Sequence, residues 1–161
     1  MKEIRYNREN AVNYAITWAV KRNPLYYDFS KIGGDCTNFA SQTLFAGSKI
    51  MNHIPILGWY YLSPTDRTAS WTGVEYFNKF IINNTDIGPF GENSKINNIE
   101  LGDFIQLKNN AEPYHHTLIV TKIEENNIFV CAHSKDALFI SLDNYSYTSL
   151  RCIHILGVRT P

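Results

Sequence analysis

The sequence has no excess of either charge, because fifteen Lys and Arg residues balance fifteen Asp and Glu residues. Binding to nucleic acid through bulk charge needs a basic excess or a clustered basic patch, so we expect no nucleic-acid partner. No apolar run approaches the ~20 residues that a membrane-spanning helix needs, and we expect no membrane insertion. The N-terminus, MKEIRYNREN, also lacks the apolar stretch of a secretory signal.

Cysteine is scarce as well. Three cysteines, Cys36, Cys131 and Cys152, are too few and odd in number for a disulfide framework. Cys131 and Cys152 lie within apolar segments, where packing in the core is the expected role and a bridge between them is the less favoured alternative. With 44% hydrophobic residues among 161, and no repeat or low-complexity linker, we expect one domain over residues 1–161.

The first half of the chain has helical periodicity and the second half has strand periodicity. Apolar residues three and four apart predict helices over 7–23, 36–47 and 70–81, with Ser70 as the cap of the third and a long aromatic loop over 51–68. Short apolar runs between turn residues predict strands at 104–107, 117–121, 128–133, 138–142 and 152–158. This order indicates an α+β fold, with N-terminal helices packed on a small antiparallel sheet or half-barrel.

The stretch Gly33-Gly34-Asp35-Cys36 precedes the second helix and favours a sharp turn into it. Asp35 is suited to cap the helix, which places Cys36 in the first turn. The helix dipole and the free N–H groups there favour negative charge, so we expect a lowered thiol pKa and donors for an oxyanion. The alternative is a capped helix that begins with a structural cysteine.

A nucleophilic cysteine needs a base, and two histidines are placed at strand ends. His116 opens a strongly apolar strand, and His133 ends the next one, so a hairpin would bring the two together. In that arrangement His133 would orient the imidazole of His116. Asp136 is the alternative for the orienting role, and we favour His133 from its place at the strand end.

These motifs resemble a known family. The segments GGDCTNFASQ, GDFIQLK and HHTLIVTK, in this order, together with the N-terminal helix and the region around Ser70-Trp71, resemble the Putative amidase domain family over residues 5–158. That family is similar to the NlpC/P60–CHAP group of papain-like cysteine hydrolases. The resemblance implies a papain-like fold with Cys36 as the nucleophile, His116 as the base and His133 or Asp136 as the third polar residue. His115 matches the preceding, non-catalytic position.

The resemblance also implies a reaction. We expect a cysteine amidase or peptidase that hydrolyses an amide bond through a thioester, with no metal or organic cofactor. The expected partner is a peptide or bacterial cell-wall peptidoglycan. The missing signal favours a cytoplasmic location for the chain as given, or a secreted or wall-associated one if a leader or other domains have been removed. The alternatives are a non-catalytic wall- or protein-binding module and an acyltransferase that uses the same triad.

Three further interpretations concern metal binding, His154 and the aromatic residues. A zinc site of Cys36, His116 and His133 has suitable ligands but lacks the usual metal-binding spacing, so it is disfavoured. His154 alternates with isoleucines and is expected on a strand surface. Four aromatic residues form either a substrate groove or a cover of the core, and the core is favoured: Trp59, Tyr60, Tyr61 and Trp71.

Overall fold

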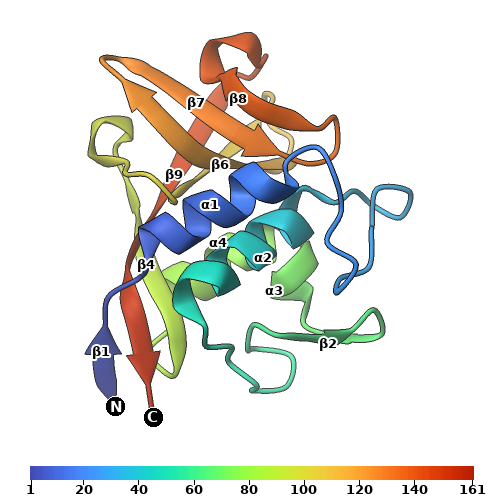
Figure 1. The fold of residues 1–161 in the computed structure, drawn as a ribbon, viewed down its shortest axis with the longest axis vertical. Helices are drawn as coiled ribbons and strands as arrows, with labels where there is room; N and C mark the ends of the chain where they lie inside the picture. The colour runs from blue at the N-terminus through green and yellow to red at the C-terminus, as the bar shows by residue number, and fades with distance from the viewer.

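The computed structural model describes residues 1–161 and has a layer of helices against an antiparallel sheet (Figure 1). The helices are α1 (Arg8–Trp18), α2 (Cys36–Ser48), α3 (Ala69–Thr72) and α4 (Val74–Asn83), with short 3-10 turns at Ile96–Asn98 and Leu142–Asn144. The strands are β1 (Lys2–Ile4), β2 (Tyr61–Ser63), β3 (Asp66–Arg67), β4 (Gly88–Ser94), β5 (Phe104–Lys108), β6 (His116–Glu124), β7 (Asn127–Ala132), β8 (Ala137–Ser141) and β9 (Ser149–Thr160). The predicted α+β class is confirmed.

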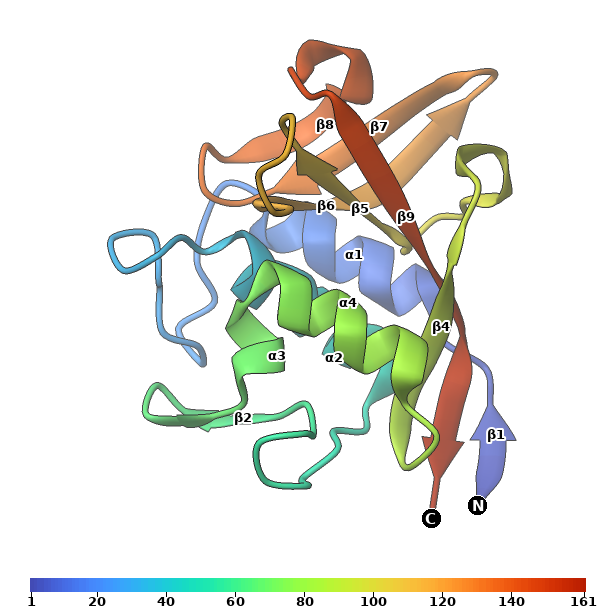
Figure 2. The same ribbon diagram turned by 180° about the vertical axis from the view of Figure 1, so that it is seen from behind.

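Seven strands form one sheet in the order β1-β9-β5-β6-β7-β8, and β4 also pairs with β9. All of its pairings are antiparallel. Strands β5 to β9 correspond to the five predicted strands, whereas β1 and β4 were not predicted. Both of these strands pair with the long β9, and their sequences lack the apolar alternation that identifies a half-buried strand. Figure 2 shows β4 and β9 side by side along one side of the helices.

The central strands are buried on both faces. Phe104 of β5 and Ile119 of β6 are paired and pack with α1, α2 and α4 in a core of twenty buried residues. Their sequence neighbours Ile105 and Leu118 point to the opposite face and belong to a second core of ten residues. This alternation follows from the two-residue period of a strand. Cys131 belongs to the first core and Cys152 to the second, on opposite faces of the sheet, and both are free thiols.

Two predicted helices have different limits in the structure. The helix expected over 70–81 is broken at Gly73, whose extended backbone (φ −104°, ψ 128°) separates α3 from α4. Thr68 precedes α3, and Ser70 lies inside it, where its hydroxyl donates to the Gly58 carbonyl. The first helix ends at Trp18, five residues before the expected limit. Its last carbonyl oxygen lies 2.8 Å from Nε2 of His133, a residue in the turn after β7.

The aromatic cluster packs in the core under α2. Trp59 and Trp71 are fully buried, and Tyr61 is 7% exposed, so these three residues cover the core and do not line a groove. Each indole N–H has a partner, because Trp59 donates to Ser41 and Trp71 donates to Asn38. Hence the burial of these polar atoms leaves none of them unpaired.

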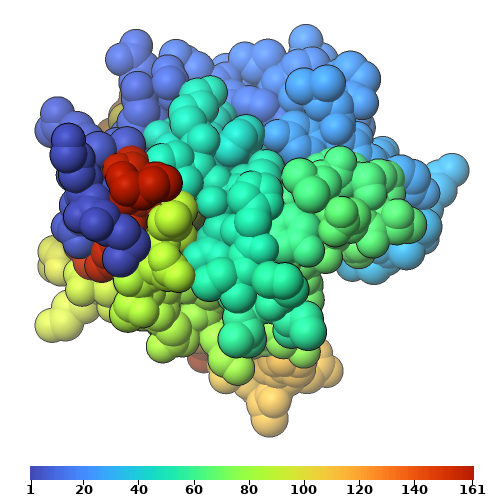
Figure 3. All heavy atoms as spheres, turned by 90° about the horizontal axis from the view of Figure 1, so that it is seen from below, coloured from blue at the N-terminus to red at the C-terminus, as the bar shows by residue number.

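The two ends of the chain lie side by side, since β1 pairs with the end of β9 (Figure 3, blue and red). No helix of the structure has both the length and the apolar character needed to cross a membrane.

Candidate active site

The turn before α2 requires glycine. Gly33 and Gly34 have φ angles of 82° and 100°, in the region that side chains with a Cβ rarely adopt. The chain then passes through Asp35 and begins the helix at Cys36. The sequence therefore predicted both the turn and the place of Cys36 at the helix N-terminus.

Asp35 does not cap the helix in the expected way. Its backbone has φ −111° and ψ 2°, whereas a capping residue is normally extended, and its side chain accepts no hydrogen bond from the helix backbone. The fully buried carboxylate instead faces the preceding loop and β7. One oxygen accepts from the Phe29 N–H at 2.8 Å and from the Asn38 amide at 2.9 Å. The other lies 2.7 Å from Nδ1 of His133.

The backbone donors in the first turn of α2 consequently have no oxygen as acceptor. The Asp35 N–H donates to the Ser134 hydroxyl, and the Phe39 N–H donates to the Asp35 carbonyl. No backbone or side-chain oxygen accepts from the N–H groups of Cys36, Thr37 and Asn38. Such donors at a helix N-terminus can hold an anion.

The Cys36 side chain is half-buried at this point, and its sulfur lies 3.7 Å from the Thr37 hydroxyl. Burial raises the pKa of the thiol above its ordinary value, and the charge of Asp35 raises it further. The backbone N–H of Thr117 and the polar groups of Thr37 act in the opposite direction without overcoming burial. The expectation of a lowered thiol pKa is therefore wrong, because it considered the helix terminus and not the desolvation of the sulfur.

His116 is the first residue of β6, and its backbone lies beside α2. The next residue, Thr117, forms a 2.9 Å hydroxyl–hydroxyl hydrogen bond with Thr37, and this bond fastens β6 to the start of α2. The pairing with Leu107 directs the His116 Cβ toward the second core, where its ring lies 5.9 Å from that of Tyr145. No hydrogen bond joins His116 to Cys36.

The environment of His116 favours a neutral imidazole. Burial, with a smaller contribution from the charge of the neighbouring His115, lowers the pKa of His116 to about 4. At neutral pH the ring is therefore uncharged, and one of its nitrogens can accept a proton.

His133 directly follows β7, packs against Phe39 of α2 and is 1% exposed. Its ring stacks on Phe39 with a centroid separation of 3.8 Å. Besides the contact with Asp35, its Nε2 lies 2.8 Å from the Trp18 carbonyl oxygen. Both ring nitrogens thus have partners other than His116, and the structure contains no hydrogen bond between the two histidines.

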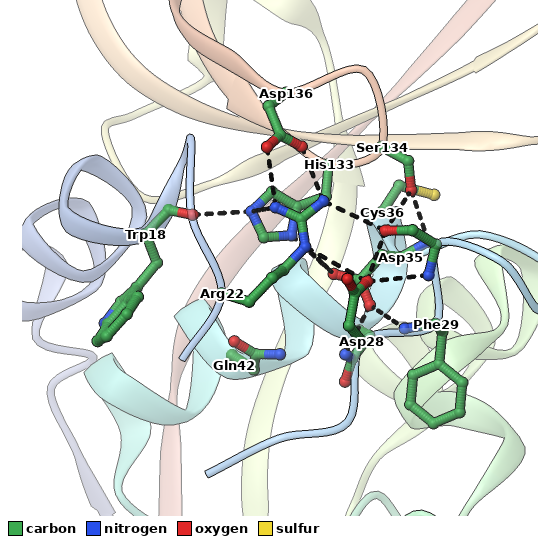
Figure 4. A network of polar contacts seen from close by, with 12 residues as sticks. Trp18, Arg22, Asp28, Phe29, Asp35, Cys36, Gln42, His133, Ser134 and Asp136 are labelled. Carbon is green, nitrogen blue, oxygen red and sulfur yellow. Dashed lines mark hydrogen bonds and ion pairs between the residues drawn. The ribbon is translucent and has the colours of Figure 1, made fainter. Parts of the chain in front are cut away.

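Asp136 is held by Arg22, which the sequence analysis did not identify (Figure 4). The two carboxylate oxygens each lie 2.9 Å from a guanidinium nitrogen, an arrangement typical of strong Arg–carboxylate pairs. Arg22 also forms ion pairs with Asp28 at 3.3 Å and with Asp35 at 3.6 Å, and its Nη1 lies 3.1 Å from His133 Nε2. A single arginine after a helix has no sequence pattern that would reveal these partners, which are distant in the chain.

The same geometry argues against zinc at this site. The structure contains no group of three His, Cys, Asp or Glu side chains placed to hold a metal ion. The nitrogens of His133 are directed at Asp35 and Trp18, so Cys36, His116 and His133 do not converge on one point.

Comparison with known proteins places the chain in a family. Residues 5–156 match the model of the Putative amidase domain, so the chain belongs to that family, whose description indicates a hydrolase acting on amides. Over 140 residues, 84% of this chain, it is 31% identical to YhbB of Bacillus subtilis (strain 168), which is described as uncharacterized. The chain spans 44% of the length of that relative. No solved structure matches significantly.

Proposed function

We propose that the protein is a cysteine amidase in which Cys36 attacks the carbonyl carbon of an amide. The observation that carries the proposal is the place of the Cys36 thiol at an uncapped helix N-terminus. The free N–H groups beside it are suited to hold the oxyanion of an acyl-transfer intermediate. Membership of the amidase family supports the reaction class.

His116 is the proposed base. The hydrogen bond between Thr37 and Thr117 keeps the first residue of β6 beside the nucleophile helix. The lowered pKa of His116 makes its imidazole neutral, and the raised pKa of Cys36 makes its thiol neutral. The His116 Cβ points toward the second core, so the proposal requires its ring to turn toward the Cys36 sulfur when substrate binds. Proton transfer to His116 is proposed to occur as the sulfur attacks.

The proposed reaction has two stages. The Cys36 sulfur bonds to the carbonyl carbon, His116 takes the thiol proton, and the N–H groups of α2 hold the negative oxygen. His116 then returns the proton to the leaving amine as the carbon–nitrogen bond breaks, which leaves a thioester. Water, activated by the neutral His116, hydrolyses the thioester and restores the thiol.

His133 is proposed as the third polar residue, and Asp136 is the alternative. The contact of His133 with Asp35, the residue before α2, supports a role in arranging the start of the nucleophile helix. In this role His133 would not bond directly to His116. The bidentate pairing of Asp136 with Arg22 supports a role in fastening the loop over residues 19–35. A papain-like fold of the NlpC/P60–CHAP type and a peptide or peptidoglycan substrate complete the proposal, on the basis of the sequence motifs.

The test is acylation by p-nitrophenyl acetate, which any competent cysteine nucleophile attacks. We expect a burst of p-nitrophenol equal to one per protein, with the acetyl group mapped to Cys36 by mass spectrometry and absent from Cys36→Ser. Acyl transfer to added amines would favour the acyltransferase alternative. If Cys36 is acylated no faster than Cys131 or Cys152 in the folded protein, the binding-module alternative gains support and the proposal fails.

A further inference from the structure

We propose that His133 is a positioning residue that holds the Asp35 carboxylate away from the N-terminus of α2, so that the backbone donors there remain available to the substrate. The inference rests on the proposed function, because it concerns the oxyanion formed by attack of Cys36. It assigns to His133 a role other than orienting the base.

Asp35 has an unusual conformation for a residue that precedes a helix. Aspartate before a helix normally adopts an extended backbone and accepts from the second or third helical N–H. Here ψ is 2°, in the sparsely populated bridge region, and the carboxylate accepts from Phe29, Asn38 and His133. A residue held in such a region requires surrounding contacts that enforce it.

His133 is able to enforce this conformation because it is itself immobile. It is buried, stacks on Phe39 and has its second nitrogen against the Trp18 carbonyl. Its Nδ1 lies 2.7 Å from Asp35 and its Nε2 lies 3.1 Å from Arg22 Nη1. Arg22 also forms a direct ion pair with Asp35 at 3.6 Å, and its charge is further balanced by Asp28 and Asp136 (Figure 4). Removal of the ring would leave this oxygen of the buried carboxylate with only the longer, 3.6 Å contact to Arg22.

The carboxylate of Asp35 and the oxyanion of the intermediate would compete for the same backbone donors. The N–H groups of Cys36, Thr37 and Asn38 donate to no oxygen, and they belong to the first turn of the helix that Asp35 precedes. A carboxylate released from His133 would gain both hydrogen bonds and a favourable helix dipole by turning to cap α2. The same donors could then not stabilise an oxyanion, and a fixed negative charge would stand beside the developing one.

Two reagents separate this role from others. Attack on p-nitrophenyl acetate passes through an oxyanion, whereas displacement of iodide from iodoacetamide does not, and both need the Cys36 sulfur. For His133→Ala we expect acylation to fall about 10²-fold, the typical effect of losing an oxyanion donor, with alkylation changed by less than about 3-fold. In Asp35→Ala/His133→Ala we expect most of the lost acylation to return, because no carboxylate remains to cap the helix. Loss of both reactions in His133→Ala, or no recovery in the double variant, would overturn the proposal.

A second pair of variants covers the case in which His133→Ala does not fold. The amide nitrogen of Asn reaches nearly the position of histidine Nδ1, and that of Gln reaches nearly the position of Nε2. We expect His133→Asn, which can still donate to Asp35, to acylate at least about tenfold faster than His133→Gln, in line with the loss of one charge-assisted hydrogen bond. Equal rates or the reverse order would contradict the role assigned to His133.

The proposed function can fail separately from this inference. If Cys36 of the unmodified protein reacts with neither reagent, the nucleophile itself is wrong. If the unmodified protein reacts and the His133 variants do not follow the expected pattern, the nucleophile stands and only the role of His133 is wrong.

Discussion

The Nδ1 atom of His133 lies 2.7 Å from a carboxylate oxygen of Asp35, although 98 positions separate the two residues in the chain. This contact joins the end of β7 to the residue that precedes the nucleophile helix. It directs the carboxylate toward the sheet, so the first turn of α2 keeps its donors free. The reactivity proposed for Cys36 therefore depends on a strand that the sequence places far from it.

Stability should decrease in acid because of His116. Its pKa is 6.5 ordinarily and about 4 in the folded protein, so the unfolded chain binds more protons between these values. Above pH 6.5 His116 does not change the free energy of unfolding, and below that pH the free energy of unfolding falls as the pH decreases toward 4. At 1.4 kcal/mol per pKa unit, the loss is at most about 3 kcal/mol. Urea unfolding at pH 7 and pH 4 measures the loss, which should be smaller by this amount in His116→Gln. An equal loss in the variant would show that other groups cause it.

Asp136→Asn should affect the loop and leave the chemistry intact. The variant retains the shape of Asp136 and loses its charge, which weakens the pairing of the 19–35 loop with the turn after β7. Because both partners are partly exposed, we expect a loss of stability of about 1 kcal/mol or less. Acylation of Cys36 should stay within about 3-fold of the unmodified protein, well above that of His133→Ala. A larger effect from Asp136→Asn than from His133→Ala would make Asp136 the third functional residue.

Removing the Thr117 hydroxyl should destabilise the protein more than removing the Thr37 hydroxyl, although the two form one hydrogen bond. Both side chains are fully buried, but the Thr117 hydroxyl also accepts from Gln106 at 3.1 Å. Thr37→Val should cost about 1 kcal/mol, whereas Thr117→Val should cost about 2 kcal/mol because it removes partners from two groups. Chemical denaturation of both variants and of the double variant measures the coupling. Additive losses would mean that the hydroxyl–hydroxyl bond contributes nothing.

The local features of the site could be predicted from sequence. Gly33 and Gly34 indicated the turn because positive φ angles favour glycine, and the start of α2 at Cys36 followed from it. The apolar runs of β5 to β9 indicated the strands because their side chains are buried. These signals lie within a few residues of the features that they predict.

The polar contacts between distant segments could not be predicted. Aspartate before a helix favours a cap, and the contacts with Phe29, His133 and Arg22, which come from other parts of the chain, turn Asp35 elsewhere. The sequence shows that Cys36 lies at a helix terminus, which favours a low thiol pKa. It does not show that the sulfur is buried, and burial raises that pKa. The role of Arg22 could not be predicted either, because its partners Asp28 and Asp136 come from separate parts of the chain.

The pH dependence of Cys36 acylation by p-nitrophenyl acetate tests the central claim most directly, with His116→Gln as the variant and His115→Gln as its matched control. If neutral His116 accepts the thiol proton, the rate in the unmodified protein and in His115→Gln should rise near pH 4, the pKa of His116, and then stay level through neutral pH. In His116→Gln the rate should instead rise about tenfold per pH unit toward the alkaline ionisation of the thiol. The same steep rise in the unmodified protein would show an ordinary buried cysteine and contradict the account.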